Sequence, residues 1–152
     1  MVSKKKSILI VEDDRDVALL LREVLEQQGY LCLLEKDGEH VMETARERLP
    51  DIVLLDIKLP GIDGFTVCRR LKKDPRTAYL PVIFISALKT EDDVREAREA
   101  GGAHYFSKPF DFQRLIEKIE EHIHRSDVSR GLAGKRILLV EAGIDDNLRT
   151  KE

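Results

Sequence analysis

Short apolar runs alternate with amphipathic stretches five times along this chain, and the alternation restricts the fold more than any other feature of the sequence. Five runs are largely apolar, as in strands that are buried on both faces: 7–12, 31–34, 52–55, 81–85 and 103–106. Five stretches carry apolar residues at helical spacing or begin at a helix-capping residue: 14–28, 39–49, 64–73, 90–101 and a last one from 111. This pattern predicts an α/β fold, a doubly wound parallel sheet with helices on both faces.

The composition is that of a water-soluble protein with one main domain. The chain has 152 residues, and its formal net charge of -3 argues against a general nucleic-acid binder. No apolar run approaches the roughly 18–20 residues that a membrane span needs, so no membrane association is expected. The cysteines, Cys32 and Cys68, form no CxxC pair, which favours a reduced protein of the cytoplasm.

Polar and charged residues follow four of the predicted strands, at the point where each strand ends. They are Glu12-Asp13-Asp14, Asp56, Ser86 and Ser107-Lys108-Pro109. Ligands of such folds lie beyond the carboxyl ends of the strands, so up to four carboxylates would converge if the first and third strands are neighbours. Their mutual repulsion calls for a cation such as Mg²⁺, and a metal-bound carboxylate that faces a lysine and a hydroxyl indicates phosphoryl transfer. For Asp14 a second interpretation stays open, because it can cap the helix that follows.

The blocks at these strand ends resemble the receiver domain of bacterial two-component response regulators. They read ILIVEDD at 8–14, DIKLPGIDG at 56–64, ISA at 85–87 and KPF at 108–110. The resemblance covers residues of about 5–125, and all blocks appear in order with family-like spacing. It implies a flavodoxin-like sheet of five parallel strands in the order 2-1-3-4-5.

The resemblance also implies which residues carry the chemistry. Asp56 matches the phosphoacceptor, which takes a phosphoryl group from a phosphohistidine of a partner kinase and also binds the metal. Asp13 and Glu12 match the family's acidic pair, with Asp13 a direct ligand of Mg²⁺ and Glu12 a ligand mainly through water. Mn²⁺ could take the place of Mg²⁺. The further protein ligand in the family is a backbone carbonyl two residues after the phosphoacceptor, here that of Lys58.

Three further residues match the part of the family site that responds to phosphorylation. Lys108 matches the lysine that pairs with a phosphoryl oxygen, and its bond to Pro109 is cis in family members. Ser86 matches the switch hydroxyl, and Tyr105 matches the aromatic residue that moves inward when this hydroxyl turns toward the phosphoryl group. For Tyr105, packing within a strand is the alternative role. Phosphorylation is thus expected to shift the population of a bistable element that a partner reads.

The partners implied by the resemblance are a sensor histidine kinase or a phosphotransfer protein, together with an effector that the sequence does not identify. The chain is expected to be a receiver module and not an enzyme, apart from its own phosphorylation from a donor and its own dephosphorylation. Lys58 and Leu88, two residues after the phosphoacceptor and the switch hydroxyl, predict slow self-dephosphorylation. The charged helix at about 91–100 could support a phosphorylation-dependent homodimer.

Three other functions compete with this interpretation. A receiver that serves for docking alone, in a hybrid or tandem-receiver protein, is disfavoured by the complete set of site residues. A magnesium-dependent phosphatase or mutase with an aspartyl nucleophile typically carries a second Asp two residues later, where this chain has Lys58. A nucleotide- or flavin-binding domain would place glycines or hydroxyls after the first strand, and Glu12-Asp13-Asp14 would repel a phosphate there.

The predicted receiver occupies residues 1–125 of the chain. Residues 126–135 have the composition of a linker, and residues 136–152 form a tail. Within the tail, ILLVE at 137–141 repeats ILIVE at 8–12 with four of five positions identical. The tail therefore resembles the first strand of a truncated second receiver, and a chance match between two strand-like runs is the alternative.

Overall fold

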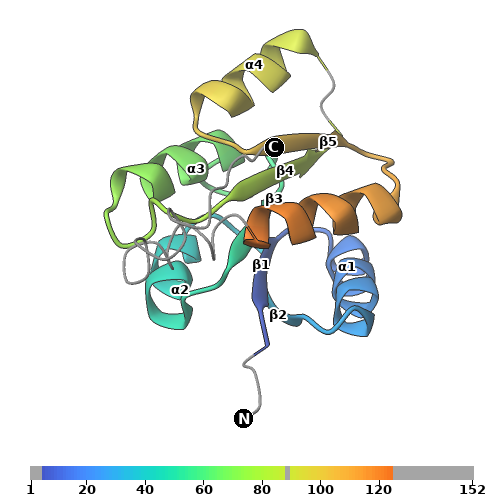
Figure 1. Ribbon diagram of the computed structural model, residues 1–152. Coiled ribbons are helices and arrows are strands. Elements are labelled where there is room, and N and C mark those ends of the chain that lie inside the picture. The colour runs from blue at the N-terminus through green and yellow to red at the C-terminus, as the bar shows by residue number, and fades with distance from the viewer. Residues whose placement is uncertain (1–4, 88–89, 125–152) are drawn as a thin grey trace, which may run out of the picture.

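Residues 5–87 and 90–124 are described by the computed structural model of the chain, and they form one parallel sheet covered by helices (Figure 1). The strands are β1 (Ser7–Val11), β2 (Leu31–Glu35), β3 (Ile52–Leu55), β4 (Val82–Ser86) and β5 (His104–Ser107). The helices are α1 (Arg15–Gln27), α2 (Val41–Arg48), α3 (Gly64–Lys73), α4 (Glu91–Glu99) and a C-terminal helix described over 112–124. The sheet order β2-β1-β3-β4-β5 confirms the predicted flavodoxin-like topology, and all neighbouring strands are parallel.

The predicted elements differ from the observed ones mainly at their ends. The first predicted strand ends one residue earlier, at Val11, which leaves Glu12 in the loop beyond the sheet. The second predicted helix begins two residues later, at Val41, and its N-cap His40 provides no side-chain hydrogen bond. Leu88, the linker at 126–135 and the tail at 136–152 lie outside the described residues, so their assignments stay predictions.

Alternate residues of the strands enter two separate apolar cores, one on each face of the sheet. On β1, Leu9 and Val11 pack into the core that includes residues of α2, α3 and α4. Ile8 and Ile10 pack into the core that includes residues of α1 and the C-terminal helix. Figure 1 shows these two sets of helices on opposite sides of the sheet. Each fully buried side chain of this size stabilises the fold by about 1.5–3 kcal/mol, so both cores hold the strand ends in place.

Side-chain caps fix the first turns of α1, α3 and α4. Asp14 accepts two backbone N–H bonds at the start of α1, which confirms the capping interpretation of this residue. Asp63 accepts one at the start of α3, and Thr90 accepts one at the start of α4 as part of a capping box with Asp93. These caps determine where each helix begins after the loop that precedes it.

The backbone at the end of α2 is strained. Leu49, the C-cap, has φ 48° and ψ 61°, and this left-handed conformation costs a residue with a side chain about 1–2 kcal/mol. Its side chain is 57% exposed, so packing compensates little. Leu49→Gly is therefore expected to raise the free energy of unfolding by about 1 kcal/mol in urea denaturation. Leu20→Gly is the control, because Leu20 is a similarly exposed residue of α1 and glycine there should lower stability by about 1 kcal/mol. If both variants lose a similar amount of stability, the backbone at Leu49 is not strained.

Candidate functional site

The acidic residues that follow β1 and β3 lie side by side at one edge of the sheet. Val11 and Leu55, the last residues of these strands, are paired in register, and the Asp56 backbone N–H donates to the Val11 carbonyl at 3.0 Å. One carboxylate oxygen from each of Glu12, Asp13 and Asp56 lies within 4.8 Å of the others. We call these three residues the acidic cluster. Of the four carboxylates expected from the sequence to converge, three do so, while the fourth, that of Asp14, caps α1.

A lysine lies between the two buried members of the acidic cluster. Glu12 and Asp56 are 4% and 7% exposed, and Lys108 Nζ donates to Glu12 Oε1 at 2.7 Å and to Asp56 Oδ2 at 3.2 Å. Burial is the largest influence on the pKa of Glu12 and raises it, and the hydrogen bond from Lys108 offsets this rise only in part. Burial alone would lower the pKa of Lys108, but its hydrogen bond to Glu12 and the charge of Asp56 raise it above the ordinary value. A single ammonium group therefore faces two buried carboxylates.

The second oxygen of each buried carboxylate accepts a backbone N–H. The Asp14 N–H donates to Glu12 Oε2 at 3.2 Å, and the Ile57 N–H donates to Asp56 Oδ1 at 2.7 Å. Asp13, by contrast, is exposed. The backbone and Lys108 thus fix the direction of two carboxylates, and the third is open to solvent.

The loop between β3 and α3 lies close against the acidic cluster. Gly64 begins α3, and its N–H donates to the Ile57 carbonyl at 2.8 Å. A Cβ atom at Gly64 would lie 2.2 Å from the Asp56 carbonyl oxygen, so a side chain cannot fit there unless the backbone moves. The loop also carries Lys58, which is exposed and lines, together with Asp13, an open groove of about 640 Å³. Lys58 therefore lies beside the acidic cluster.

The ends of β4 and β5 bring the other predicted site residues next to the acidic cluster. Ser86 is 1% exposed, and its carbonyl accepts the Lys108 N–H at 2.8 Å. Tyr105 is half-buried on β5, where burial and the charge of Asp93 raise its pKa and a hydrogen bond with Ser86 lowers it. The Lys108–Pro109 peptide bond is cis, as the resemblance implied. The hydroxyl, the aromatic residue and the lysine are thus connected through neighbouring strands.

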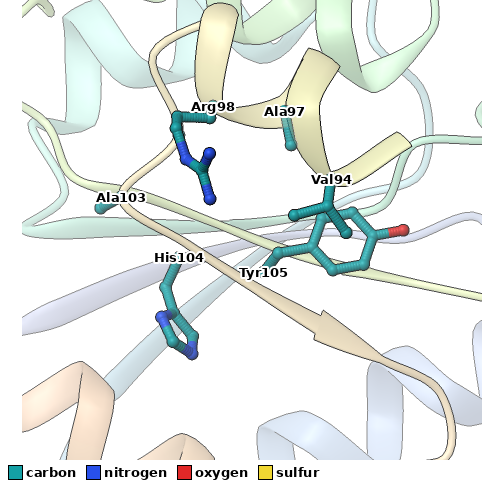
Figure 2. A pocket seen from close by; sticks show the side chains of 7 residues that line it. Val94, Ala97, Arg98, Ala103, His104 and Tyr105 are labelled. Atoms are coloured by element: carbon teal, nitrogen blue, oxygen red, sulfur yellow. The ribbon is translucent and has the colours of Figure 1, made fainter. Parts of the chain in front are cut away.

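A smaller pocket, which the sequence pattern does not predict, lies between α4 and β5. Its volume is about 200 Å³, and Tyr105 lines it together with Val94, Ala97 and Arg98 of α4 (Figure 2). For this helix the sequence predicts a charged surface that could support a phosphorylation-dependent homodimer, and no pocket. The spacing of Val94, Ala97 and Arg98 at i, i+3 and i+4 is the signal that these residues share one face, here the face toward β5.

The acidic cluster fits a hard divalent cation. It is the one group of three or more clustered candidate metal ligands among residues 5–87 and 90–124, and it offers carboxylate oxygens alone. Such ligands suit Mg²⁺ or Mn²⁺ better than metals that prefer nitrogen or sulfur. Within the same part of the chain, no helix is both long and apolar enough to cross a membrane.

Comparisons with known proteins match this geometry to one family. The family model of the response regulator receiver domain matches residues 8–120. The chain is 37% identical over 120 residues to the DNA-binding dual master transcriptional regulator RpaA of Synechocystis, and this match covers 79% of the chain but half of RpaA. It is 36% identical over 118 residues to the polar-differentiation response regulator DivK of Brucella anthropi, a match that covers 78% of this chain and 96% of DivK.

A solved structure with a metal is also similar. It is the receiver domain of the sensor histidine kinase PA1611 from Pseudomonas aeruginosa, with a magnesium ion coordinated in its active-site cleft. The TM-score is 0.74 and the sequence identity 26%, over 80% of this chain and 99% of that one. The acidic cluster thus resembles a receiver site in which Mg²⁺ has been observed.

Proposed function

The chain belongs to the response regulator receiver domain family, and on this premise we propose that Asp56 accepts a phosphoryl group from a phosphohistidine of a sensor histidine kinase or a phosphotransfer protein. The observation that carries the proposal is the position of Asp56: nearly buried, in a cluster of three carboxylates, with Lys108 at 3.2 Å. As a receiver domain, the chain is a signalling module and not a catalytic enzyme. The chain spans only half the length of RpaA. The partners and the output of the whole protein are therefore proposed here as well.

Each residue of the site would have a separate role in phosphoryl transfer. An Asp56 oxygen attacks the phosphorus, the P–N bond of the phosphohistidine breaks with its electron pair left on the imidazole, and an acyl phosphate forms on Asp56. A bound Mg²⁺, or Mn²⁺, would be held by Asp13, Asp56, the Lys58 carbonyl and, through water, Glu12, and would supply positive charge to the phosphoryl oxygens. Lys108 would exchange a carboxylate partner for a phosphoryl oxygen.

The change would then reach the surface through β4 and β5. Ser86 lies at the end of β4 and is hydrogen-bonded to Tyr105, so a turn of its hydroxyl toward the phosphoryl group would release the tyrosine ring. Tyr105 lines the pocket beside α4, so its movement would alter the surface of that helix. An effector, or a second copy of the chain that pairs through the helix at 91–99, would bind this altered surface with a different affinity.

Phosphorylation by a small donor tests the proposed function directly. The chain is incubated with acetyl phosphate and Mg²⁺ and its intact mass is measured. We expect an increase by one phosphoryl group that requires the divalent cation and is reversed by hydroxylamine, which cleaves acyl phosphates. An unchanged mass, or a label that resists hydroxylamine, would refute the proposal.

Removal of Lys108 should strengthen metal binding in the unphosphorylated protein. Lys108→Met deletes a positive charge that touches two members of the acidic cluster, so Mg²⁺ affinity is expected to rise about tenfold. Isothermal titration calorimetry measures the change. Lys118→Met is the matched control, because Lys118 pairs with Glu121 on the C-terminal helix and should leave the affinity unchanged. An unaltered affinity in the Lys108 variant would show that the ammonium group does not compete with the metal.

The phosphoryl group is expected to be lost slowly, with a lifetime well beyond seconds. Lys58 is exposed beside the acidic cluster, where its ammonium group can approach phosphoryl oxygens. Lys58→Ala should therefore shorten the lifetime several-fold, consistent with the loss of an exposed ion pair of about 1 kcal/mol. The decay of the phosphorylated mass after removal of the donor measures it. Loss within seconds in the unaltered chain would contradict the expectation.

A further inference from the structure

The ends of α2 and α3 form a surface that the proposed function does not use. The two helices lie next to each other on one side of the sheet (Figure 1). Arg46 of α2 and Asp74, the C-cap of α3, form an ion pair at 3.3 Å, so the ends of both helices meet. The backbone N–H of Asp51, three residues after α2, donates to the carbonyl of Ser7 at the start of β1. The surface therefore lies at the edge where the strands begin, opposite the acidic cluster.

Positive charge is concentrated at this surface. The segments 46–48 and 69–76 carry seven arginine and lysine residues against two acidic ones, in a chain whose net charge is -3. Arg46 donates to Asp74, and Arg76 donates at 3.2 Å to each of the two Asp74 oxygens. The hydrogen bonds from Arg76 and Arg46 lower the pKa of Asp74. The Asp74 carboxylate is therefore already occupied and leaves the other cations of the surface without compensation.

Three exposed cations of this surface form no ion pair with any residue that the structure describes. They are Arg48 of α2 and Arg70 and Lys73 of α3. Arg70 and Lys73 are three residues apart, so they lie on the same side of α3. By contrast, Arg69 of the same helix is paired with Glu96 at 2.9 Å. We call the three unpaired cations, together with Arg76, the basic patch.

An exposed leucine lies beside the basic patch. Leu49 follows Arg48, its side chain is 57% exposed, and its backbone is left-handed, with φ 48°. Neither property stabilises the isolated domain, because leucine is disfavoured at positive φ and an exposed side chain packs little. A strained residue whose side chain contributes little to the fold is a candidate for contact with a partner. Leu49 therefore adds an apolar contact to a positively charged surface.

An acidic protein segment fits this surface better than nucleic acid or a membrane does. Carboxylates match the guanidinium groups of Arg48 and Arg70 in bidentate pairs, and a neighbouring apolar side chain can pack on Leu49. The backbone of nucleic acid offers phosphate and sugar groups, which provide no comparable apolar contact. The net charge of -3 opposes binding to an extended anionic surface more than binding to a short acidic segment.

We propose that the basic patch and Leu49 bind an acidic segment of a partner protein, in which carboxylates pair with Arg48, Arg70 and Lys73 while an apolar side chain packs on Leu49. This interaction goes beyond the proposed function, because it involves neither the phosphoacceptor nor the pocket beside α4. The surface would hold the domain on its partner in both the unphosphorylated and the phosphorylated state.

A peptide titration of the full chain tests the proposal. The probe is the blocked peptide acetyl-Leu-Glu-Glu-Leu-Glu-Glu-amide, and its glutamine counterpart is the neutral comparison. In ¹⁵N-labelled protein we expect saturable shifts of the amide signals of Leu49, Lys73 and Arg76. The glutamine peptide should bind about tenfold more weakly, since it loses several exposed ion pairs. Equal binding of the two peptides would overturn the proposal.

Two charge variants locate the binding site. Arg70→Gln should weaken binding of the acidic peptide about threefold, as expected for the loss of one exposed ion pair. Arg114→Gln is the matched control, because Arg114 is an exposed residue of the C-terminal helix, which packs on the other face of the sheet. It makes the same change in charge and should leave the affinity unchanged. Equal effects of the two variants would refute the assignment to the basic patch.

Leu49→Gly should change stability and binding in opposite directions. The variant is expected to be more stable, because glycine relieves the left-handed strain. It should nevertheless bind the acidic peptide about fivefold more weakly, because the apolar contact is lost. A loss of folded protein cannot produce this combination. Unchanged binding by the variant would contradict the proposed contact with Leu49.

Parallel samples test other anionic occupants and separate this proposal from the proposed function. A short DNA duplex and phosphatidylserine vesicles are titrated in place of the peptide. Tighter binding of either one than of the peptide would overturn the proposal, and weaker binding of both would support it. Asp56→Asn should bind the peptide like the unaltered chain, because Asp56 lies at the opposite edge of the sheet. A failure of phosphorylation would therefore refute the proposed function and leave the result for the basic patch intact.

Discussion

Asp56→Asn is expected to abolish phosphorylation by acetyl phosphate and by a kinase, with no phosphorylated protein detectable in the intact mass. The variant replaces the carboxylate oxygens by an amide of the same shape, which lacks the nucleophile that forms the acyl phosphate. The fold should persist, because Lys108 keeps its 2.7 Å contact with Glu12 and one buried negative charge is removed. The circular dichroism spectrum and the unfolding midpoint check that the variant is folded.

Asp14→Asn is the matched control for this prediction. Asp14 belongs to the same acidic run, but its side chain caps α1, and asparagine caps helices about as well as aspartate. The control should therefore take up the phosphoryl group like the unaltered chain. Equal labelling of Asp56→Asn and the unaltered chain would place the acceptor elsewhere and refute the assignment.

Gly64→Ala should have the largest effect on stability, lowering the free energy of unfolding by about 3 kcal/mol. The added methyl would lie 2.2 Å from the Asp56 carbonyl oxygen and 2.8 Å from the Ile57 Cα, and both atoms belong to the backbone. This overlap can be relieved only if the loop between β3 and α3, which carries Lys58, moves. We therefore expect weaker Mg²⁺ binding as well as a lower unfolding midpoint in urea.

Gly29→Ala separates steric overlap from backbone strain. Gly29 has φ 96°, and no atom lies within 4 Å of the position that an added methyl group would take. Its substitution therefore costs the left-handed conformation alone, about 1 kcal/mol. Metal binding should remain unchanged in this control. If the two variants lose the same stability, the close approach at Gly64 is not what determines the effect.

The sequence predicted the fold because the fold depends on patterns that are local in the chain. Apolar runs such as 8–11 and helical spacing as in 14–28 require no knowledge of distant residues. The convergence of Glu12, Asp13 and Asp56 was also predictable, since parallel strands that are neighbours end at the same edge.

Other features depend on contacts between distant segments, and the sequence could not supply them. The sequence predicted that Lys108 lies at the site, but its hydrogen bonds to both Glu12 and Asp56 depend on the placement of β5 relative to β1 and β3. The pocket at Arg98 depends on the distance between α4 and β5, which periodicity leaves undetermined. The left-handed backbone of Leu49 was missed because leucine is uncommon in that conformation.

The sheet separates the apolar interior of the domain into two cores, one on each of its faces. Leu25 of α1 and Leu71 of α3 lie in different cores, so the energetic effects of substitutions at these positions should be largely additive. Each outer face can then change its set of binding partners with little effect on packing across the sheet. The acidic cluster lies at the edge of the sheet where both cores end, so a chemical change in the cluster takes place close to each core.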